Sequence, residues 1–104
     1  MFLELSEDNL AQYVSDKPTV FVQFSAGWCG NCRLMKPKFK KLSDEHQAAL
    51  FVLADAEKYP ESRKLAQVNN LPTFAAFRDG QLVNQLQTNK FDLLKEFIDE
   101  AARN

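Results

Sequence analysis

The sequence predicts one α/β domain in which a mixed sheet of about five strands is covered by four helices. Apolar, β-branched segments alternate with amphipathic segments at helical spacing, and this alternation is typical of β-α-β units. A chain of 104 residues with 45% hydrophobic and 12% aromatic residues is long enough to bury its own core. It contains no repeat and no Ser/Gly-rich linker, so we expect residues 1–104 to form a single domain.

The first two elements are expected to be a short strand over residues 2–5 and a helix over 7–16. Apolar residues recur in the helical segment at intervals of three and four, the spacing of one buried helix face. Ser6 is a residue type that caps helix N-termini, and we expect it to do so here. Pro18 lacks a backbone N–H group and marks the break before the next element.

A central strand and a long helix are expected next. Residues 19–25 are mostly β-branched and aromatic and carry no charge, as expected for a strand covered on both faces. After a turn over 27–30, apolar residues at helical spacing among lysines and arginines indicate an amphipathic helix that ends near Gln47. Pro37 is expected to kink this helix because it removes one helical hydrogen bond.

The middle of the chain is expected to supply a buried strand over residues 50–55 and a short helix over 61–68. Leu65 and Val68 have the spacing of residues that face the core. These elements continue the alternation of strand and helix, so the first strands should run parallel to one another.

A hairpin and a helix are expected to complete the domain. Residues 73–77 and 82–86 flank Asp79-Gly80, a pair that supplies the positive φ angles of a tight hairpin turn. The last helix is indicated by five apolar residues that share one face: Phe91, Leu94, Phe97, Ile98 and Ala101. The predicted order is therefore β-α-β-α-β-α-β-β-α.

Composition argues against several classes of partner. The formal net charge of −1 gives no field that favours nucleic acid or an anionic membrane. The longest apolar runs are far shorter than the roughly 20 residues that span a bilayer, so no membrane segment is predicted. The first residues are acidic where a secretory signal is basic, and we therefore expect a cytoplasmic protein. Nothing in the composition indicates an obligate dimer, so a monomer is expected.

The motif that carries chemistry is Trp28-Cys29-Gly30-Asn31-Cys32, at the passage from the central strand into the long helix. Cys29 should lie at or just before the helix N-terminus, where free N–H groups and the helix dipole stabilise a nucleophilic thiolate. Cys32 should lie one turn further on, where it can attack a mixed disulfide formed at Cys29. We predict an attacking Cys29 exposed at the helix tip and a resolving Cys32 inside the helix.

Plainer interpretations of this region are inert buried thiols or a zinc site. His46 follows Cys32 at a zinc-finger spacing, but a second histidine and a second cysteine pair are missing, and structural zinc takes four ligands. We predict no metal, and expect His46 to be a solvated residue at a helix end. The cations of the long helix are interpreted as its solvated face, and Arg33 is the one among them that could also contribute to stabilising a thiolate.

By these residues the sequence resembles the thioredoxin family, and the resemblance extends over nearly the whole chain. It implies the thioredoxin fold, a mixed central sheet of about five strands flanked by four helices. Besides the cysteine motif it rests on several positions at the family's spacing: Phe24, Pro37, Leu71-Pro72-Thr73, Phe77 with Asp79-Gly80, and Lys95-Glu96-Phe97.

The resemblance also implies roles for residues outside the cysteine pair. In that family the proline at the position of Pro72 is cis and packs against the active-site sulfurs, and the residue before it pairs with an extended substrate. These roles fall on Pro72 and Leu71, with Thr73 next in the substrate-binding segment. Trp28 is expected to contact substrate. Gly30 and Asn31 are expected to support the active site.

Three departures from the family pattern bear on mechanism. Asn31 replaces the common proline between the cysteines, which restores an N–H group and loosens the helix start. Gln23 takes the position of the family's buried aspartate, thought to carry the proton of the second cysteine. We expect a core glutamine whose polar atoms are all satisfied by hydrogen bonds and which cannot accept this proton. Leu53 stands where many members have lysine. These changes predict a more oxidising couple and a slower resolving step.

Two carboxylates lie at or just after the end of the strand expected over residues 50–55. Asp55 and Glu57 should be solvated, unless the fold places one of them beneath Cys32, where it could relay a proton.

The resemblance implies a thiol–disulfide oxidoreductase that reduces protein disulfides through a Cys29/Cys32 cycle. It would be re-reduced by a thioredoxin reductase and would need no bound cofactor. Two alternatives stay open. One is a more oxidising isomerase or glutathione-exchange protein, and the other is a binding or redox-sensing module that uses the fold as a scaffold.

Overall fold

The computed structural model describes residues 1–103 and contains five strands and four helices in the predicted order. The elements are β1 (Phe2–Glu4), α1 (Leu10–Asp16), β2 (Thr19–Ser25), α2 (Gly30–Glu45), β3 (Leu50–Asp55), α3 (Pro60–Arg63), β4 (Thr73–Arg78), β5 (Gln81–Gln87) and α4 (Phe91–Arg103).

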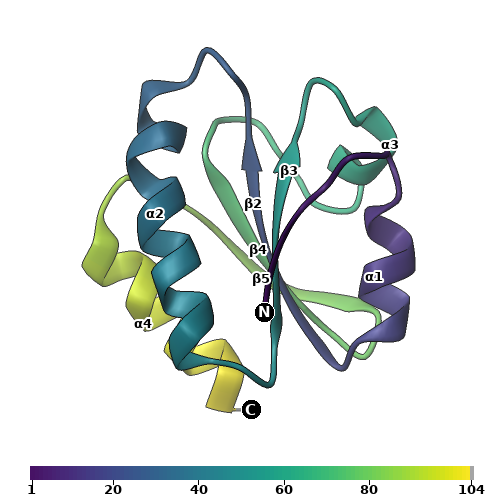
Figure 1. Cartoon of the computed structure of the whole chain (residues 1–104), viewed down its shortest axis with the longest axis vertical. Coiled ribbons are helices and arrows are strands. Elements are labelled where there is room, and N and C mark those ends of the chain that lie inside the picture. Colours follow the sequence, from purple (N-terminus) through teal and green to yellow (C-terminus); the bar gives the residue numbers. More distant parts are fainter. Residues whose placement is uncertain (104) are drawn as a thin grey trace.

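The five strands form one mixed sheet in the order β1-β3-β2-β4-β5. β1, β3 and β2 are parallel, whereas β4 pairs antiparallel with β2 and with β5. Figure 1 shows α2 and α4 on one face of this sheet and α1 and α3 on the other. The predicted α/β architecture is confirmed, and β2 and β3 have the bounds expected from their apolar runs.

Each face of the sheet carries its own core. Beneath α2 and α4 the core is aromatic: the Phe39 ring lies 5.0 Å from Phe51 and 5.6 Å from Phe74, centroid to centroid. These separations fall in the range in which tilted rings attract one another. On the other face Leu10 and Val14 of α1 join a core in which aliphatic strand residues predominate, with Phe24 and Phe77 among them. α2 continues without interruption through Pro37.

The hairpin between β4 and β5 has the predicted turn. Asp79 and Gly80 both have positive φ, at 51° and 83°, which is the left-handed conformation that the turn requires. The pairing register shifts between Ala76 and Phe77, so the outermost strand β5 is bulged. Beside this irregularity the Gln85 N–H donates to the Asn84 side chain at 2.9 Å.

The predicted start of the first helix is wrong. α1 begins at Leu10, and Ser6 does not cap it. The Leu10 N–H instead donates to the hydroxyl of Ser62, 3.1 Å away in α3, and that hydroxyl donates to Asp8 at 2.7 Å. The cap therefore comes from a residue distant in sequence, and the segment before α1 serves to hold α3.

The predicted third helix is too long. α3 ends at Arg63, and the following N–H groups of Leu65 and Ala66 bond to carbonyls three residues back, as in a tighter turn. The Arg63 guanidinium donates to the Val68 carbonyl at 2.8 Å and so holds the chain in this turn. Val68 is buried and Leu65 packs against the core, as their spacing indicated.

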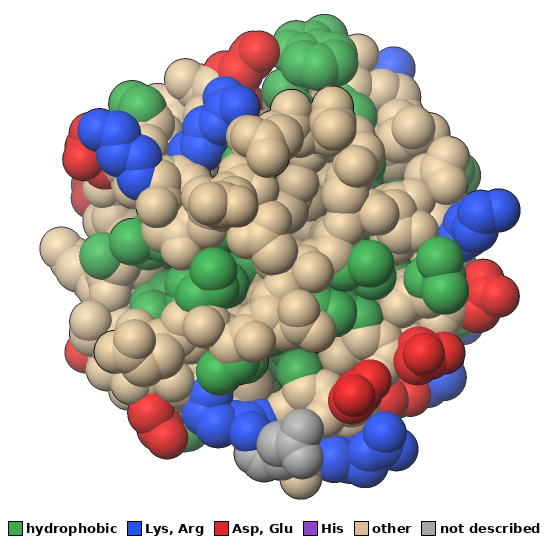
Figure 2. Space-filling model, turned by 180° about the vertical axis from the view of Figure 1, so that it is seen from behind, with side chains coloured by type: hydrophobic (Ala, Val, Ile, Leu, Met, Phe, Trp, Pro, Cys, Tyr) green, Lys and Arg blue, Asp and Glu red, His purple; other side chains and the backbone are tan. Residues whose placement is uncertain are grey.

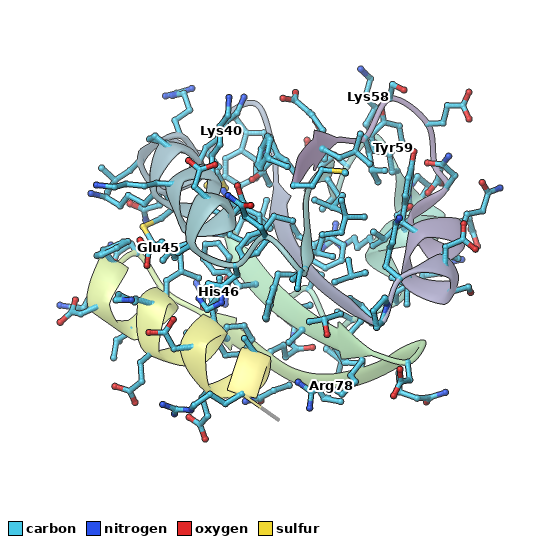
Figure 3. All side chains as sticks on the ribbon, turned by 60° about the horizontal axis from the view of Figure 1, so that its bottom comes forward. Lys40, Glu45, His46, Lys58, Tyr59 and Arg78 are labelled. Carbon is cyan, nitrogen blue, oxygen red and sulfur yellow. A yellow bond between two sulfur atoms is a disulfide. The ribbon has the colours of Figure 1, made fainter. Side chains whose placement is uncertain are left out.

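The C-terminal end of α2 is tied to α4, which corrects the expectation of a solvated His46. The His46 ring is one-fifth exposed, lies over Phe51 and bonds through Nε2 to Asp99 Oδ1 at 2.8 Å. Lys95 bridges Asp99 at 3.0 Å and Glu45 at 3.4 Å. Figure 3 places Glu45 and His46 where α2 meets α4.

This network predicts a pH-dependent part of the stability. The hydrogen bond from Lys95, opposed by desolvation and helped by His46, holds the pKa of Asp99 below its usual value. A carboxyl with a lowered folded-state pKa stabilises the fold above its unfolded pKa of about 4 and loses that contribution as pH falls through the folded value. Asp99→Asn should therefore cost up to about 1 kcal/mol at pH 7, and nothing near pH 2. Thermal unfolding at both pH values measures this.

Glu96→Gln is the matched control, because Glu96 lies exposed on the same helix with no side-chain bond or ion pair among residues 1–103. An Asp99→Asn destabilisation that stayed constant down to pH 2 would contradict the pairing.

The back of the molecule carries charges of both signs without a dominant patch. Figure 2 shows apolar side chains in separate small groups on the back of the molecule, with lysine, arginine and acidic residues around the rim. Within residues 1–103 we find no helix long and apolar enough to cross a membrane.

Candidate active site

The two cysteines lie where the sequence places them, at the junction of β2 and α2. Cys29 is the N-cap residue of α2 and Gly30 is the first helical residue. The Cys32 backbone N–H donates to Cys29 Sγ at 3.2 Å, so this sulfur lies against the N–H groups of the first helical turn. That environment favours negative charge on Cys29 Sγ when the pair is reduced.

Cys29 and Cys32 form a disulfide, with their Cα atoms 5.2 Å apart. The expected difference in burial is wrong for this state, because Cys29 is 5% exposed and Cys32 3%. Ala26 and Leu71 pack against the pair. Access to Cys29 is therefore confined to a small area of the sulfur.

Trp28 lies on the surface beside the disulfide and is 68% exposed. Its indole Nε1–H donates to Glu57 Oε2 at 2.8 Å, in the loop after β3. Neither side chain lies in a local sequence motif that could have indicated this partner. Arg33 donates to the Gly27 carbonyl at 3.1 Å, so its guanidinium is engaged by the loop backbone.

The segment before β4 forms the other side of the site. The Leu71–Pro72 peptide bond is cis, as the resemblance implied. Within residues 1–103 no hydrogen bond engages the Leu71 backbone N–H or carbonyl. Asn31, Leu71 and Pro72 line an open groove of about 330 Å³ together with the residues 87–90 that connect β5 to α4. The groove lies beside the cysteine helix and has one free stretch of backbone.

Thr73 does not present its side chain to this groove. It is 2% exposed, and its hydroxyl donates to the Asn70 carbonyl at 2.5 Å. Its position in β4 is paired with both neighbouring strands, opposite Phe24 and Gln87. The structure therefore supports a role for the Thr73 side chain in holding the turn before β4.

Gln23 is fully buried directly behind the active-site helix. Its Nε2 donates to the Cys32 carbonyl at 3.1 Å and to Ser25 Oγ at 3.0 Å. The Cys32 carbonyl can only accept, which fixes the amide orientation and leaves Oε1 as the buried atom without a partner in the described chain. Gln23 is thus only partly satisfied. Leu53 stands directly opposite it in the β2–β3 ladder.

A second hollow, a cavity of about 310 Å³, reaches Cys32 from the side of β3. Its wall includes Ser25, Leu53, Asp55 and Tyr59. Within residues 1–103 no group of three or more His, Cys, Asp or Glu side chains is arranged to hold a metal ion. The chemistry available at the site is therefore that of the cysteine pair and its polar neighbours.

Comparison with known proteins agrees with this geometry. The family model described as Thioredoxin matches residues 1–100. The chain belongs to the thioredoxin family. The disulfide at the helix N-terminus and the cis-proline segment both lie within the matched residues.

The individual thioredoxins that resemble the chain come from organisms as different from one another as Arabidopsis thaliana and human. Thioredoxin H9 of Arabidopsis thaliana is 33% identical over 91 residues, which cover 86% of this chain and 65% of the relative. Human thioredoxin is 33% identical over 81 residues, 78% of this chain and 77% of the relative. The solved thioredoxin of Schistosoma mansoni is 28% identical, with a TM-score of 0.85 over 95% of this chain and 96% of that one.

Several thioredoxin relatives are longer than this chain. It spans 65%, 53% and 48% of the length of Arabidopsis Thioredoxin H9, the mitochondrial Thioredoxin-2 of Schizosaccharomyces pombe and the chloroplastic Thioredoxin Y2 of Arabidopsis.

Proposed function

We propose that the protein is a thiol–disulfide oxidoreductase that reduces disulfides in other proteins. The observation that carries this proposal is the Cys29–Cys32 disulfide at the N-terminus of α2, beside a groove with free backbone at Leu71. The Cys29 thiolate attacks one sulfur of a substrate disulfide; the substrate S–S bond breaks, the other sulfur leaves as the first substrate thiolate, and a mixed disulfide with Cys29 remains. Cys32 then attacks the Cys29 sulfur, which releases the second substrate thiol and regenerates the intramolecular disulfide.

The substrate would lie across the two sides of the site. An extended segment pairs its backbone with Leu71, and Pro72 shapes the groove beside the disulfide. The exposed Trp28 ring offers an apolar face to the same segment, held in place by its bond to Glu57. Gly30 lets the substrate approach the helix start, and Asn31 lines the groove.

The electron donor, the cofactor requirement, the compartment and the oligomeric state are proposed from the resemblance to the family. Electrons come from a thioredoxin reductase, and the cysteine pair itself needs no bound cofactor. The protein acts in the cytoplasm as a monomer. Relatives named as mitochondrial and chloroplastic make the compartment a separate question, which cell fractionation decides.

The equilibrium redox potential of the Cys29–Cys32 couple tests the function. A reversible potential near the roughly −270 mV of thioredoxin supports a protein-disulfide reductase. A potential nearer the roughly −180 mV of disulfide isomerases would assign the chain to a more oxidising exchange protein. A pair that does not oxidise reversibly would refute both and leave a binding scaffold.

A more oxidising couple is the second candidate, and the buried neutral Gln23 on the Cys32 carbonyl favours it. Gln23→Asp should move the potential about 10–30 mV to more negative values, because a buried carboxylate opposes the Cys29 thiolate, and 30 mV corresponds to about 1.4 kcal/mol. It should also speed the resolving step by offering a proton acceptor. Thiol/disulfide buffers and stopped-flow kinetics measure the two effects.

Gln23→Asn is the matched control, since it shortens the side chain equally but adds no charge. A Gln23→Asp protein with the potential and the resolving rate of the parent would refute this explanation.

A further inference from the structure

Cys32 must lose its proton before it can attack the mixed disulfide, and its immediate neighbours do not take that proton. Gln23 presents an amide nitrogen to the Cys32 carbonyl, and that nitrogen only donates. Leu53, opposite Gln23 in the neighbouring strand, is apolar. A base for this step therefore has to reach Cys32 from elsewhere.

One carboxylate on the wall of the cavity beside Cys32 is placed to accept the Cys32 proton. Asp55 ends β3 and lies on the wall of the same 310 Å³ cavity as Cys32. A volume of this size holds several water molecules. Ser25 stands beside Asp55 in the β2–β3 ladder, and its hydroxyl binds the Gln23 nitrogen that also bonds the Cys32 carbonyl. Polar groups thus extend from Cys32 to the position next to Asp55.

The hydrogen bonds of Asp55 leave half of its carboxylate available. Oδ1 accepts the backbone N–H groups of Glu57 and Lys58, both at 2.9 Å. Oδ2 has no partner within residues 1–103. Asp55 is half-buried and lines the cavity, so water can reach its carboxylate. The two backbone bonds hold the carboxylate in a fixed place.

The other charged groups on the cavity wall are engaged or have the wrong sign. Glu4, on β1, pairs with Lys36 of α2 at 3.2 Å and is largely exposed. Arg33 donates to the loop carbonyl of Gly27.

The loop after β3 contributes the remaining two titratable side chains of the wall. The Tyr59 hydroxyl donates to the Leu5 carbonyl at 3.2 Å. Lys58 is a cation; Figure 3 labels it with Tyr59 in the loop after β3. Asp55 is therefore the one carboxylate of this wall without an ion pair among the described residues.

We propose that Asp55 accepts the proton of the Cys32 thiol through water in this cavity. The inference rests on the oxidoreductase function proposed above. The Cys32 Sγ–H bond breaks, its proton passes through water to Asp55 Oδ2, and the Cys32 thiolate attacks Cys29 Sγ. The Cys29–substrate disulfide bond breaks as the Cys29–Cys32 bond forms, and its electron pair leaves on the substrate thiolate, which takes a proton from solvent. Asp55 then returns its proton to solvent.

The test follows both half-reactions in one experiment. Reduced protein is mixed with an equimolar amount of dithiobis(nitrobenzoate), and nitrothiobenzoate release is recorded by stopped flow. The first phase reports attack by Cys29, and the second reports attack by Cys32. Asp55→Asn keeps an oxygen for the Glu57 and Lys58 N–H groups, so the loop is retained. We expect the second phase to slow about tenfold or more at pH 7, and the first to change less than about twofold.

The pH profile separates proton acceptance from a structural role. In the Asp55→Asn protein the second-phase rate should rise with pH and approach the parent rate near pH 9, where hydroxide removes the thiol proton. Glu4→Gln removes a charge from the same wall and should leave both phases unchanged. Equal slowing of both phases, a deficit that persists at pH 9, or an equal effect of Glu4→Gln would overturn the proposal.

Failure of this inference differs from failure of the function. An unchanged second phase in the Asp55→Asn protein would refute the role of Asp55 and leave the oxidoreductase intact. A parent protein that released no second nitrothiobenzoate would refute the cysteine cycle, and with it the inference.

Discussion

Serine in place of Cys29 should reduce protein-disulfide reduction by about 1,000-fold or more, whereas serine in place of Cys32 should arrest the protein as a covalent complex with its substrate. The difference follows from position. Cys29 Sγ lies against the first N–H groups of α2, while Cys32 is inside the helix and bonded through its carbonyl to buried Gln23. Without Cys29 the mixed disulfide cannot form, and without Cys32 it forms but is not released.

Turnover with a disulfide-bonded protein and dithiothreitol measures the first effect, and non-reducing electrophoresis with mass spectrometry identifies the trapped complex. Each serine variant is the control for the other. A covalent complex formed by the Cys29→Ser protein as readily as by the Cys32→Ser protein would mean that Cys32 is also an attacking thiol, against the assignment made here.

Removing the Phe39 ring should destabilise the fold by about 3–5 kcal/mol, a large part of the roughly 5–15 kcal/mol that stabilises an ordinary domain. Phe39 is fully buried at the centre of the aromatic core. Its ring centroid lies 6.3 Å from that of Phe2, 5.0 Å from that of Phe51 and 5.6 Å from that of Phe74. Alanine would leave a cavity between α2 and the sheet. Denaturant unfolding of the Phe39→Ala protein measures the loss.

Phe91→Ala is the matched control, because Phe91 packs against the same core at the start of α4 but stays partly exposed. We expect it to cost less than half as much as Phe39→Ala. Equal losses would mean that the aromatic core does not depend on Phe39 as its centre.

The strands were predictable because the residues that determine each of them lie within the strand itself or in the adjoining turn. β2 and β3 are short segments in which apolar, β-branched and aromatic residues predominate, and the hairpin turn is encoded by Asp79 and Gly80. The ends of two helices were not predictable. The start of α1 depends on Ser62, which is far away in sequence, so a local cap at Ser6 was the wrong inference.

The active site divides in the same way. The place of Cys29 at a helix start follows from a strand, a short turn and an amphipathic helix in succession. The bond between Trp28 and Glu57 and the shared cavity of Cys32 and Asp55 join β2–α2 to the end of β3, and only the fold brings these segments together. The burial of Cys29 was missed because Leu71, which packs against the cysteine pair, comes from a segment distant in sequence.

The bulged outer strand β5 also affects how the protein behaves at high concentration. β5 is one margin of the sheet and exposes Leu82 and Val83, a combination that invites pairing with a strand from another molecule. The register shift twists this margin. The Gln85 N–H group already donates to the Asn84 side chain, so it is not available to hydrogen-bond an added strand. At the opposite margin β1 has only three residues. Both margins therefore oppose the growth of the sheet from molecule to molecule, which protects the chain against aggregation.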